Sequence, residues 1–138
     1  MALTGRFHPL LVHFPIALVL IAAVAEVVSV TTRFRAWHLV AVANIRAGAA
    51  FAVAAAGAGW ILASSRIVEA SSALEWHRWL GGAGAVAAVA AALATAELDR
   101  PPQRLWLYRI ALFWAAALVA VAGHFGALLV WGADFLRP

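Results

Sequence analysis

The stretch FHPLLVHFPIALVLIAAVA, residues 7–25, decides the fold of this chain. After His13 it carries no ionisable residue and consists mainly of Leu, Ile, Val and Ala until Glu26. Such a run predicts a transmembrane helix, because about 20 apolar residues span the hydrocarbon core of a bilayer. Pro9 suits the first turn of that helix, where its missing N–H costs no hydrogen bond. The stretch also raises a question of function, since His8 and His13 stand at the threshold of an apolar helix.

The composition of the whole chain agrees with insertion into a membrane. Of its 138 residues, 66% are hydrophobic and 12% are charged, whereas a soluble domain has about 25% charged residues. The net charge of +4 comes from ten arginines without a lysine. These arginines stand singly near the ends of segments, which excludes the basic face of a nucleic-acid binder. Cysteine is absent, so disulfides, iron–sulfur clusters and covalently attached c-type haem are excluded.

Four apolar stretches with short polar breaks predict an all-α fold, a single domain of four transmembrane helices. They run over about 9–30, 37–63, 72–97 and 105–131. Short connections favour antiparallel neighbours, and therefore an up-down-up-down bundle with both termini on the same membrane side. We expect a multi-pass protein of the bacterial inner membrane. A small excess of arginine on the opposite side indicates that the side with the termini is periplasmic.

Four of the five histidines fall on the side with the termini: His8, His13, His77 and His124. Three of them, His13, His77 and His124, reach overlapping depths on three helices, so they are predicted to point into one cavity. His124 lies inside an apolar span, where ionisable residues are rare and usually functional. We predict that two of these three ligate a haem b, or that all three hold a metal ion. His8, just outside the span, is predicted to support the site or to contact a propionate.

Small residues beside these histidines indicate room for a flat cofactor. Gly123 and Gly126 flank His124, and Gly81 lies below His77 on the same helical face. Close packing of helices is the plain alternative use of such glycines. Arg78 is a candidate partner for the haem propionates at the interface, because a guanidinium binds carboxylates through paired hydrogen bonds.

Several functions remain open on these residues. Haem b is favoured, which makes the chain an electron-transfer subunit within a larger respiratory or redox complex. A histidine copper or zinc site, a quinone site and a cofactor-free accessory subunit are the alternatives. No Ser-His-Asp set, HExxH motif, phosphate-binding glycine loop or pair of carboxylates is present, so we do not expect an enzyme in its own right.

The other half of the membrane carries a second group of polar residues. Glu26 and Arg46 approach similar depths on neighbouring spans, so a buried ion pair is predicted, with Asn44 as a further hydrogen-bond partner. His38 lies next to Trp37 at this boundary and is interpreted as an interface residue.

Three motifs resemble those of a bacterial membrane family, the domain of unknown function 2231: HPLLVHFPIAL near the start, EWHRWLG at the third span and GHFGALLVWG near the end. The resemblance covers nearly the whole chain in the same order. The histidines of the family match His8, His13, His77 and His124, while His38 has no counterpart. Relatives joined to cytochrome c-like or Rieske-type modules imply an electron-transfer neighbourhood. Because this chain has no such module, the resemblance implies partners: other membrane redox subunits and a periplasmic cytochrome or Rieske-type protein, besides membrane lipid.

Overall fold

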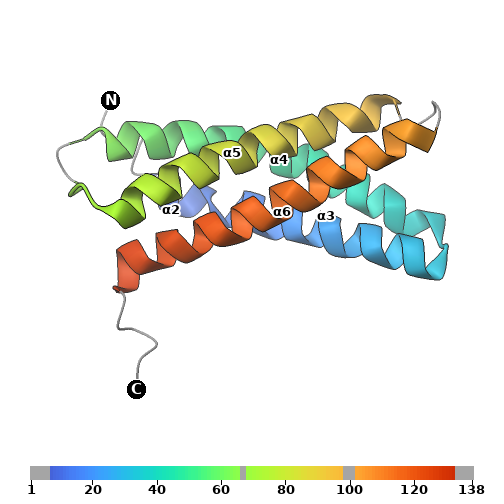
Figure 1. The fold of residues 1–138 in the computed structure, drawn as a ribbon, viewed down its shortest axis with the longest axis horizontal. Coiled ribbons are helices and arrows are strands. Elements are labelled where there is room, and N and C mark those ends of the chain that lie inside the picture. The colour runs from blue at the N-terminus through green and yellow to red at the C-terminus, as the bar shows by residue number, and fades with distance from the viewer. Residues whose placement is uncertain (1–6, 66–67, 98–101, 133–138) are drawn as a thin grey trace, which may run out of the picture.

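The computed structural model describes residues 7–65, 68–97 and 102–132, and these residues form helices and no strand (Figure 1). The elements are α2 (His8–Leu11), α3 (His13–Thr32), α4 (Arg35–Ala63), α5 (Ser72–Ala94), the short 3-10 helix η1 (Thr95–Glu97) and α6 (Pro102–Trp131). The four long helices overlap the four predicted spans. The all-α fold predicted from the sequence is therefore confirmed.

Local sequence explains where the long helices begin and end. Arg33 follows α3 in the left-handed conformation, with φ of 57°, and so turns the chain from α3 into α4. Ser71 caps α5, because its hydroxyl oxygen accepts a hydrogen bond of 3.2 Å from the N–H of Leu74. Such a cap satisfies one of the free donors at the start of a helix. Each helix direction is thus set by a few residues at its ends.

The four long helices form a closed ring in which each packs on two neighbours. α3 packs chiefly on α4, α5 packs chiefly on α6, and the contacts of α4 with α5 and of α3 with α6 close the ring. Successive helices run in opposite directions (Figure 1). We call the end of the bundle with His8 and His77 the histidine end. The opposite end, with Arg33 and Arg109, is the arginine end.

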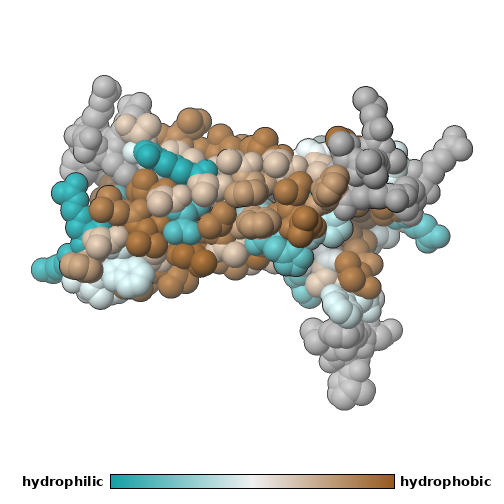
Figure 2. Space-filling view, turned by 180° about the vertical axis from the view of Figure 1, so that it is seen from behind, coloured by the Kyte–Doolittle hydropathy of each residue, from teal (hydrophilic) through white to brown (hydrophobic). Residues whose placement is uncertain are grey.

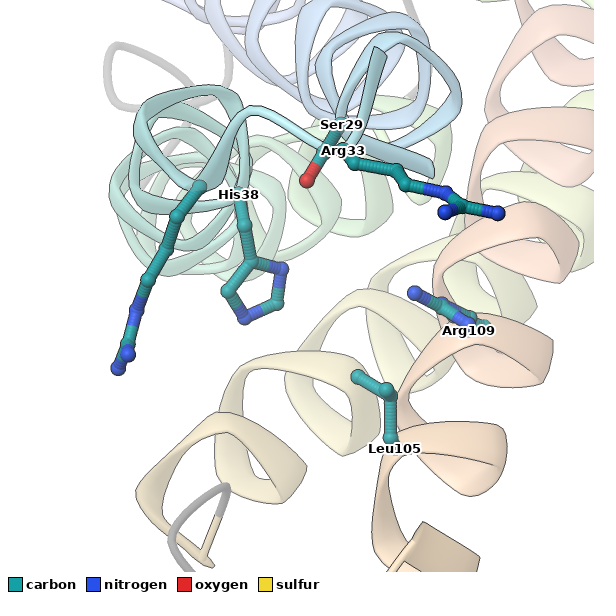
Figure 3. A pocket seen from close by; sticks show the side chains of 6 residues that line it. Ser29, Arg33, His38, Leu105 and Arg109 are labelled. Carbon is teal, nitrogen blue, oxygen red and sulfur yellow. The ribbon is translucent and has the colours of Figure 1, made fainter. Parts of the chain in front are cut away.

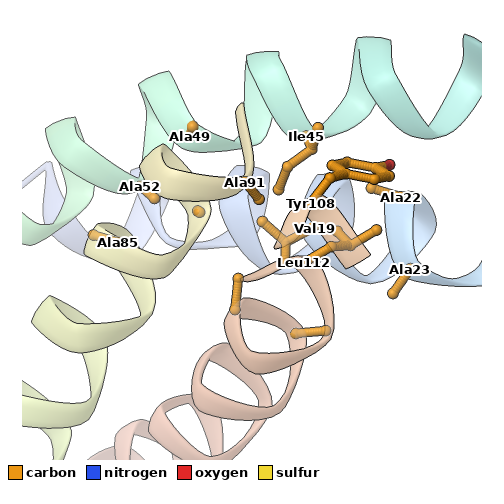
Figure 4. Close-up of a cluster of buried hydrophobic side chains, with 13 residues drawn as sticks. Val19, Ala22, Ala23, Ile45, Ala49, Ala52, Ala85, Ala91, Tyr108 and Leu112 are labelled. Carbon is orange, nitrogen blue, oxygen red and sulfur yellow. The ribbon is translucent and has the colours of Figure 1, made fainter. Parts of the chain in front are cut away.

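The core between the helices is built largely from alanine (Figure 4). Its largest fully buried apolar side chains are Val19, Ile45 and Leu112, and Tyr108 is also 0% exposed. Small residues at helix interfaces let the backbones approach closely, which is how helices associate where no water drives them together. Close contacts between small side chains therefore hold the helices together.

The outer surface fits a lipid environment over most of its length. Figure 2 shows hydrophobic side chains covering most of the middle of one face, with hydrophilic residues gathered mainly toward the ends. In the described part of the chain, three helices are long and apolar enough to cross a membrane: His8–Thr32, Arg35–Ala63 and Leu105–Trp131. α5 is not among them, since it carries Glu75, His77 and Arg78 ahead of its apolar stretch. The third predicted span is thus a bundle helix of weaker membrane character.

The buried positions reveal a duplication within the chain. We call α2, α3 and α4 the first hairpin, and α5 and α6 the second hairpin. The buried Pro15, Val19, Ala22 and Glu26 of α3 recur 69 positions later as the buried Gly84, Ala88, Ala91 and Thr95. The six buried residues of α4, from Ala41 to Ala55, recur 67 positions later as the six buried residues of α6, from Tyr108 to Ala122. The two hairpins are therefore related by an approximate two-fold axis along the bundle.

Candidate functional site

The histidine end brings two imidazole rings together on this approximate axis. His8 of α2 and His77 of α5 occupy equivalent positions, and their Nε2 atoms lie 3.4 Å apart. The ring centroids are 5.7 Å apart and the ring planes are inclined by 77°. Because the Nε2 atoms are closer together than the centroids, the two nitrogens lie between the rings. Both residues are half-buried.

The second nitrogen of each ring is bound to the backbone of the facing helix. His8 Nδ1 lies 2.8 Å from the carbonyl oxygen of Ala55, and His77 Nδ1 lies 2.8 Å from that of Ala122. A carbonyl oxygen only accepts hydrogen bonds, so each Nδ1 carries a hydrogen and donates it. In the neutral rings both Nε2 atoms are therefore unprotonated. Two lone pairs facing each other across this distance repel, so a proton or a metal ion between them would be stabilising.

A glycine in the facing helix makes room for each ring. A Cβ atom on Gly59 would lie 2.7 Å from Cε1 of His8, and one on Gly126 would lie 3.0 Å from Cε1 of His77. Any side chain at these positions would push the ring away from the helix. The space beside Gly126, predicted for a flat cofactor, is thus occupied by the imidazole of His77.

The structure does not bring His13 or His124 into this pair. Both side chains are exposed, and the ring of His124 makes an edge contact with Phe125 at 5.8 Å between centroids. Within residues 7–65, 68–97 and 102–132, no group of three or more His, Asp or Glu side chains is placed to hold a metal ion. The predicted cluster of His13, His77 and His124 is therefore not formed.

Helical phase explains which histidines face inward. His8 precedes the buried Pro15 and Ala22 by seven and fourteen residues, and these three positions share one face of the first span. His13 lies off that face. The second hairpin repeats the spacing, with His77 seven residues before the buried Gly84. This seven-residue spacing was the signal in the sequence that identifies His8, rather than His13, as the partner of His77.

The remaining predicted site residues have other surroundings. A Cβ on Gly81 would meet nothing within 4 Å, and one on Gly123 would make an ordinary contact of 3.7 Å with Cδ1 of Ile16. The guanidinium carbon of Arg78 lies 4.2 Å from the ring centroid of Trp60, a cation–π contact. The Nε atom of Arg78 is buried and has no hydrogen-bond partner among the described residues.

The pair does not fit a haem between its rings. Zinc–imidazole bonds are about 2.0–2.1 Å long and those of other first-row metals are similar, so axial nitrogens on opposite sides of one iron stand about 4 Å apart. The Nε2 atoms of His8 and His77 are closer, at 3.4 Å. Both rings are also tied to backbone carbonyls and lie against glycines of the facing helices. A macrocycle would have to displace these rings from the positions that the fold gives them.

The arginine end contains a second polar cluster, centred on Glu26. This carboxylate is 0% exposed. Its Oε2 accepts hydrogen bonds from His38 Nδ1 at 2.7 Å and from the Tyr108 hydroxyl at 3.4 Å, and its Oε1 accepts one from Arg109 Nε at 2.8 Å. A buried carboxylate needs such donors to offset its loss of hydration. His38 is thus part of a hydrogen-bonded cluster and more than an interface residue.

The predicted ion pair between Glu26 and Arg46 is wrong. Arg46 Nε instead donates to the hydroxyl oxygen of Thr95 at 2.7 Å, and the side-chain amide of Asn44 donates to the carbonyl of Val40 at 2.9 Å. The reason lies in the ring of helices: Glu26 of α3 bonds to Arg109 of α6, whereas Arg46 of α4 bonds to Thr95 next to α5. The contacts of Glu26 with Arg109 and of Arg46 with Thr95 both join the first hairpin to the second.

Comparisons with known proteins agree with the sequence motifs. The model of a family described as a predicted membrane protein, DUF2231, matches residues 6–135. The match spans most of the chain, so the chain belongs to this family. No curated protein and no solved structure matches it.

Proposed function

We propose that this member of the DUF2231 family is a membrane subunit that binds one copper ion, as Cu(I), between His8 and His77. The observation that carries the proposal is the distance of 3.4 Å between the two Nε2 atoms, which carry no hydrogen when both rings are neutral and donate through Nδ1. Each ring is held for this purpose by its Nδ1–H bond to a backbone carbonyl. Such bonds fix the tautomer of a metal-binding histidine and raise the basicity of its free nitrogen.

The number of ligands selects the metal. Zinc in proteins takes four ligands, or three and a water, and no third His, Asp or Glu joins the pair within the described residues. Cu(I) is satisfied by two imidazoles. A bare ion needs no macrocycle between the rings. Two-coordinate Cu(I) is close to linear, with its nitrogens about 4 Å apart, so the pair would open by a few tenths of an ångström from 3.4 Å to hold it. Copper, one of the alternatives left open by the sequence, therefore has more support than haem b.

The setting of the pair supports a role in a redox complex. When bound, copper would supply a one-electron couple or a transferable soft cation. His8 and His77 would hold the ion at one end of the bundle, while the exposed His13 and His124 remain free to face a partner subunit. We place this chain in the bacterial inner membrane with the histidine end toward the periplasm, beside other redox subunits and a periplasmic cytochrome or Rieske-type protein.

A cofactor-free accessory subunit is the second candidate, and one observation favours it. The distance of 3.4 Å between the Nε2 atoms also permits a shared proton, with one ring an imidazolium that donates to the other. In that case the pair would simply tie the first hairpin to the second. Interhelical hydrogen bonds in membrane proteins contribute about 0.6 kcal/mol on average, so this role is structural.

The test is a Cu(I) titration of the full chain in detergent, against a chromogenic Cu(I) chelator under anaerobic conditions. We expect one copper per chain. His8→Gln and His77→Gln should each weaken binding by more than about a hundredfold, since even groups that only orient metal ligands contribute about 10–100-fold. His13→Gln and His124→Gln are matched controls, which remove exposed histidines and should leave the affinity unchanged.

Three results would contradict the copper site. Absence of stoichiometric binding would favour the accessory subunit. Loss of binding in His13→Gln or His124→Gln, with His8→Gln unaffected, would move the site away from the pair. An intense Soret band in the protein as purified, with resolved α and β bands after reduction, would restore the haem b hypothesis.

A further inference from the structure

A hollow of about 250 Å³ opens at the arginine end, far from the histidine pair. It lies where α3 ends and where α4 and α6 begin (Figure 3). Its lining consists of Ser29, Arg33, Arg35, His38, Leu105 and Arg109. The lining therefore contains three guanidinium groups, an imidazole and a hydroxyl, and no carboxylate.

The charges around the hollow are not balanced by the described residues. Glu26, the carboxylate that bonds to two of the lining residues, is buried and accepts hydrogen bonds from His38, Tyr108 and Arg109. Arg33 and Arg35 form no hydrogen bond or ion pair with any residue of the described ranges. Positive charge is thus left over at the mouth of the hollow.

The side chains converge although their charges repel. Figure 3 shows the guanidinium groups of Arg33 and Arg109 extending toward the same space from different elements, with the ring of His38 facing it. Arg33 stands in the turn between α3 and α4, whose left-handed φ of 57° fixes where its side chain starts. Arg109 is held through its Nε atom by Glu26. The fold therefore holds the side chain of Arg109 and fixes the backbone from which that of Arg33 extends, and an anion between the two guanidinium groups would reduce their repulsion.

The position of the hollow along the helices indicates which anion it meets. Arg33 lies just beyond the end of the apolar span His8–Thr32, and Arg35 is the first residue of the span Arg35–Ala63. The ends of apolar spans coincide with the headgroup layer of the bilayer, where lipid phosphates lie. Guanidinium groups bind phosphate oxygens through paired hydrogen bonds. Arginines at this level are attracted to anionic lipid.

We propose that this hollow binds the phosphate group of an anionic phospholipid. Arg33 and Arg109 contact the phosphate oxygens from two sides, Ser29 donates a hydroxyl hydrogen bond, and Arg35 adds positive charge at the rim. The bound lipid would join the turn between α3 and α4 to the start of α6. A free phosphate has the same chemistry, and the test below separates the two sources.

The test measures thermal stability of the full chain in detergent with three additions: phosphatidylglycerol, phosphatidylcholine and inorganic phosphate. We expect phosphatidylglycerol to raise the unfolding temperature in a saturable manner, and phosphatidylcholine and inorganic phosphate to have no such effect. The double variant R33Q/R35Q should need about tenfold or more phosphatidylglycerol for half of the effect, because each arginine near an anionic surface adds to its attraction. R78Q removes one positive charge at the histidine end and serves as the control for R33Q, which removes one at the arginine end.

Each other outcome overturns the proposal. An equal response of R33Q/R35Q and the unaltered chain would show that the lipid acts elsewhere. Equal stabilisation by inorganic phosphate would show a site for a soluble anion. Arg33 and Arg35 are exposed, so their removal should leave the fold intact, and an unchanged helical circular dichroism spectrum checks this. R33K keeps the positive charge but loses the planar guanidinium. If the phosphate is bound as proposed, the phosphatidylglycerol concentration that R33K needs for half of the effect should lie between those of the unaltered chain and of R33Q/R35Q.

Discussion

The two hairpins share one buried framework and differ in what they place at its ends. At the histidine end they match, with His8 against Ala55 and Gly59 in the first hairpin and His77 against Ala122 and Gly126 in the second. At the arginine end they diverge, since the position that holds Glu26 in the first hairpin holds Thr95 in the second. The framework thus tolerates different polar chemistry at equivalent positions, provided that each buried group finds a donor.

The strongest test of this comparison is Glu26→Ala. Its removal leaves the guanidinium of Arg109, which is 29% exposed, without its anion, and breaking one partner of a buried ion pair costs about 3–5 kcal/mol. We expect a loss near the lower limit, about 3 kcal/mol, in the free energy of unfolding measured by SDS titration in mixed micelles. Glu26→Gln keeps hydrogen-bond acceptance and should lose less. If Glu26→Ala lowered the free energy of unfolding by less than Thr95→Val does, the proposed difference between the two hairpins would be contradicted.

The glycines at the histidine end should respond alike in both hairpins. Gly59→Ala brings a Cβ to within 2.7 Å of the ring of His8, and Gly126→Ala to within 3.0 Å of the ring of His77. Overpacking of this kind costs about 1–3 kcal/mol. We expect both variants to lose stability and to weaken Cu(I) binding, with the larger loss for Gly59→Ala. Unchanged copper affinity in both variants would show that the rings are not held against these glycines.

We expect a smaller loss of stability when the hydrogen bond between Arg46 and Thr95 is removed. Thr95→Val removes the hydroxyl that accepts from Arg46 at 2.7 Å while keeping the shape of the side chain. A hydrogen bond to a charged group contributes about 1.5–3 kcal/mol, and we expect the lower limit here because Arg46 is exposed and its guanidinium can bind water instead. The same SDS titration should therefore place Thr95→Val well below Glu26→Ala. In the double variant with Arg46→Gln, we expect the two costs to be less than additive, because both changes remove one contact.

The smallest change concerns glycines that touch nothing. A Cβ on Gly57 or Gly81 would meet no atom within 4 Å, so Gly57→Ala and Gly81→Ala should raise stability by up to about 1 kcal/mol through helix propensity. Their copper affinity should not change. A loss of copper binding in Gly81→Ala would revive the prediction that this glycine lines a cofactor site.

The helices could be predicted from the sequence because their signals are local. Apolar length and the Pro9 start are read within a single segment, and the Ser71 cap that the structure shows likewise acts within three residues. The pairing of side chains depends on contacts between helices. Depth alone made His124 a better candidate than His8, whereas the rotation of each helix decides that His124 is exposed and His8 faces His77.

The rotation of the helices also decides which arginine bonds to Glu26. A buried carboxylate in an apolar span predicts a nearby cation, and that expectation is met. Arg46 and Arg109 lie on the two helices that flank α3 in the ring, and the choice between them depends on which of these faces Glu26. The duplication would have helped, because aligning the two hairpins on His8 and His77 places Glu26 and Thr95 at equivalent positions and shows that each needs its own donor.

The approximate two-fold axis has a consequence for how the arginine end arose. Two separate, identical hairpins would form a symmetric dimer, and every residue near the axis would occur twice. Such a dimer can build the histidine pair, in which the two halves are alike. It cannot place a glutamate at one position and a threonine at its equivalent, because both halves would be read from one gene sequence. Joining the hairpins in one chain lets the two copies mutate independently, and so permits a carboxylate cluster and an anion-binding hollow on only one side of the axis.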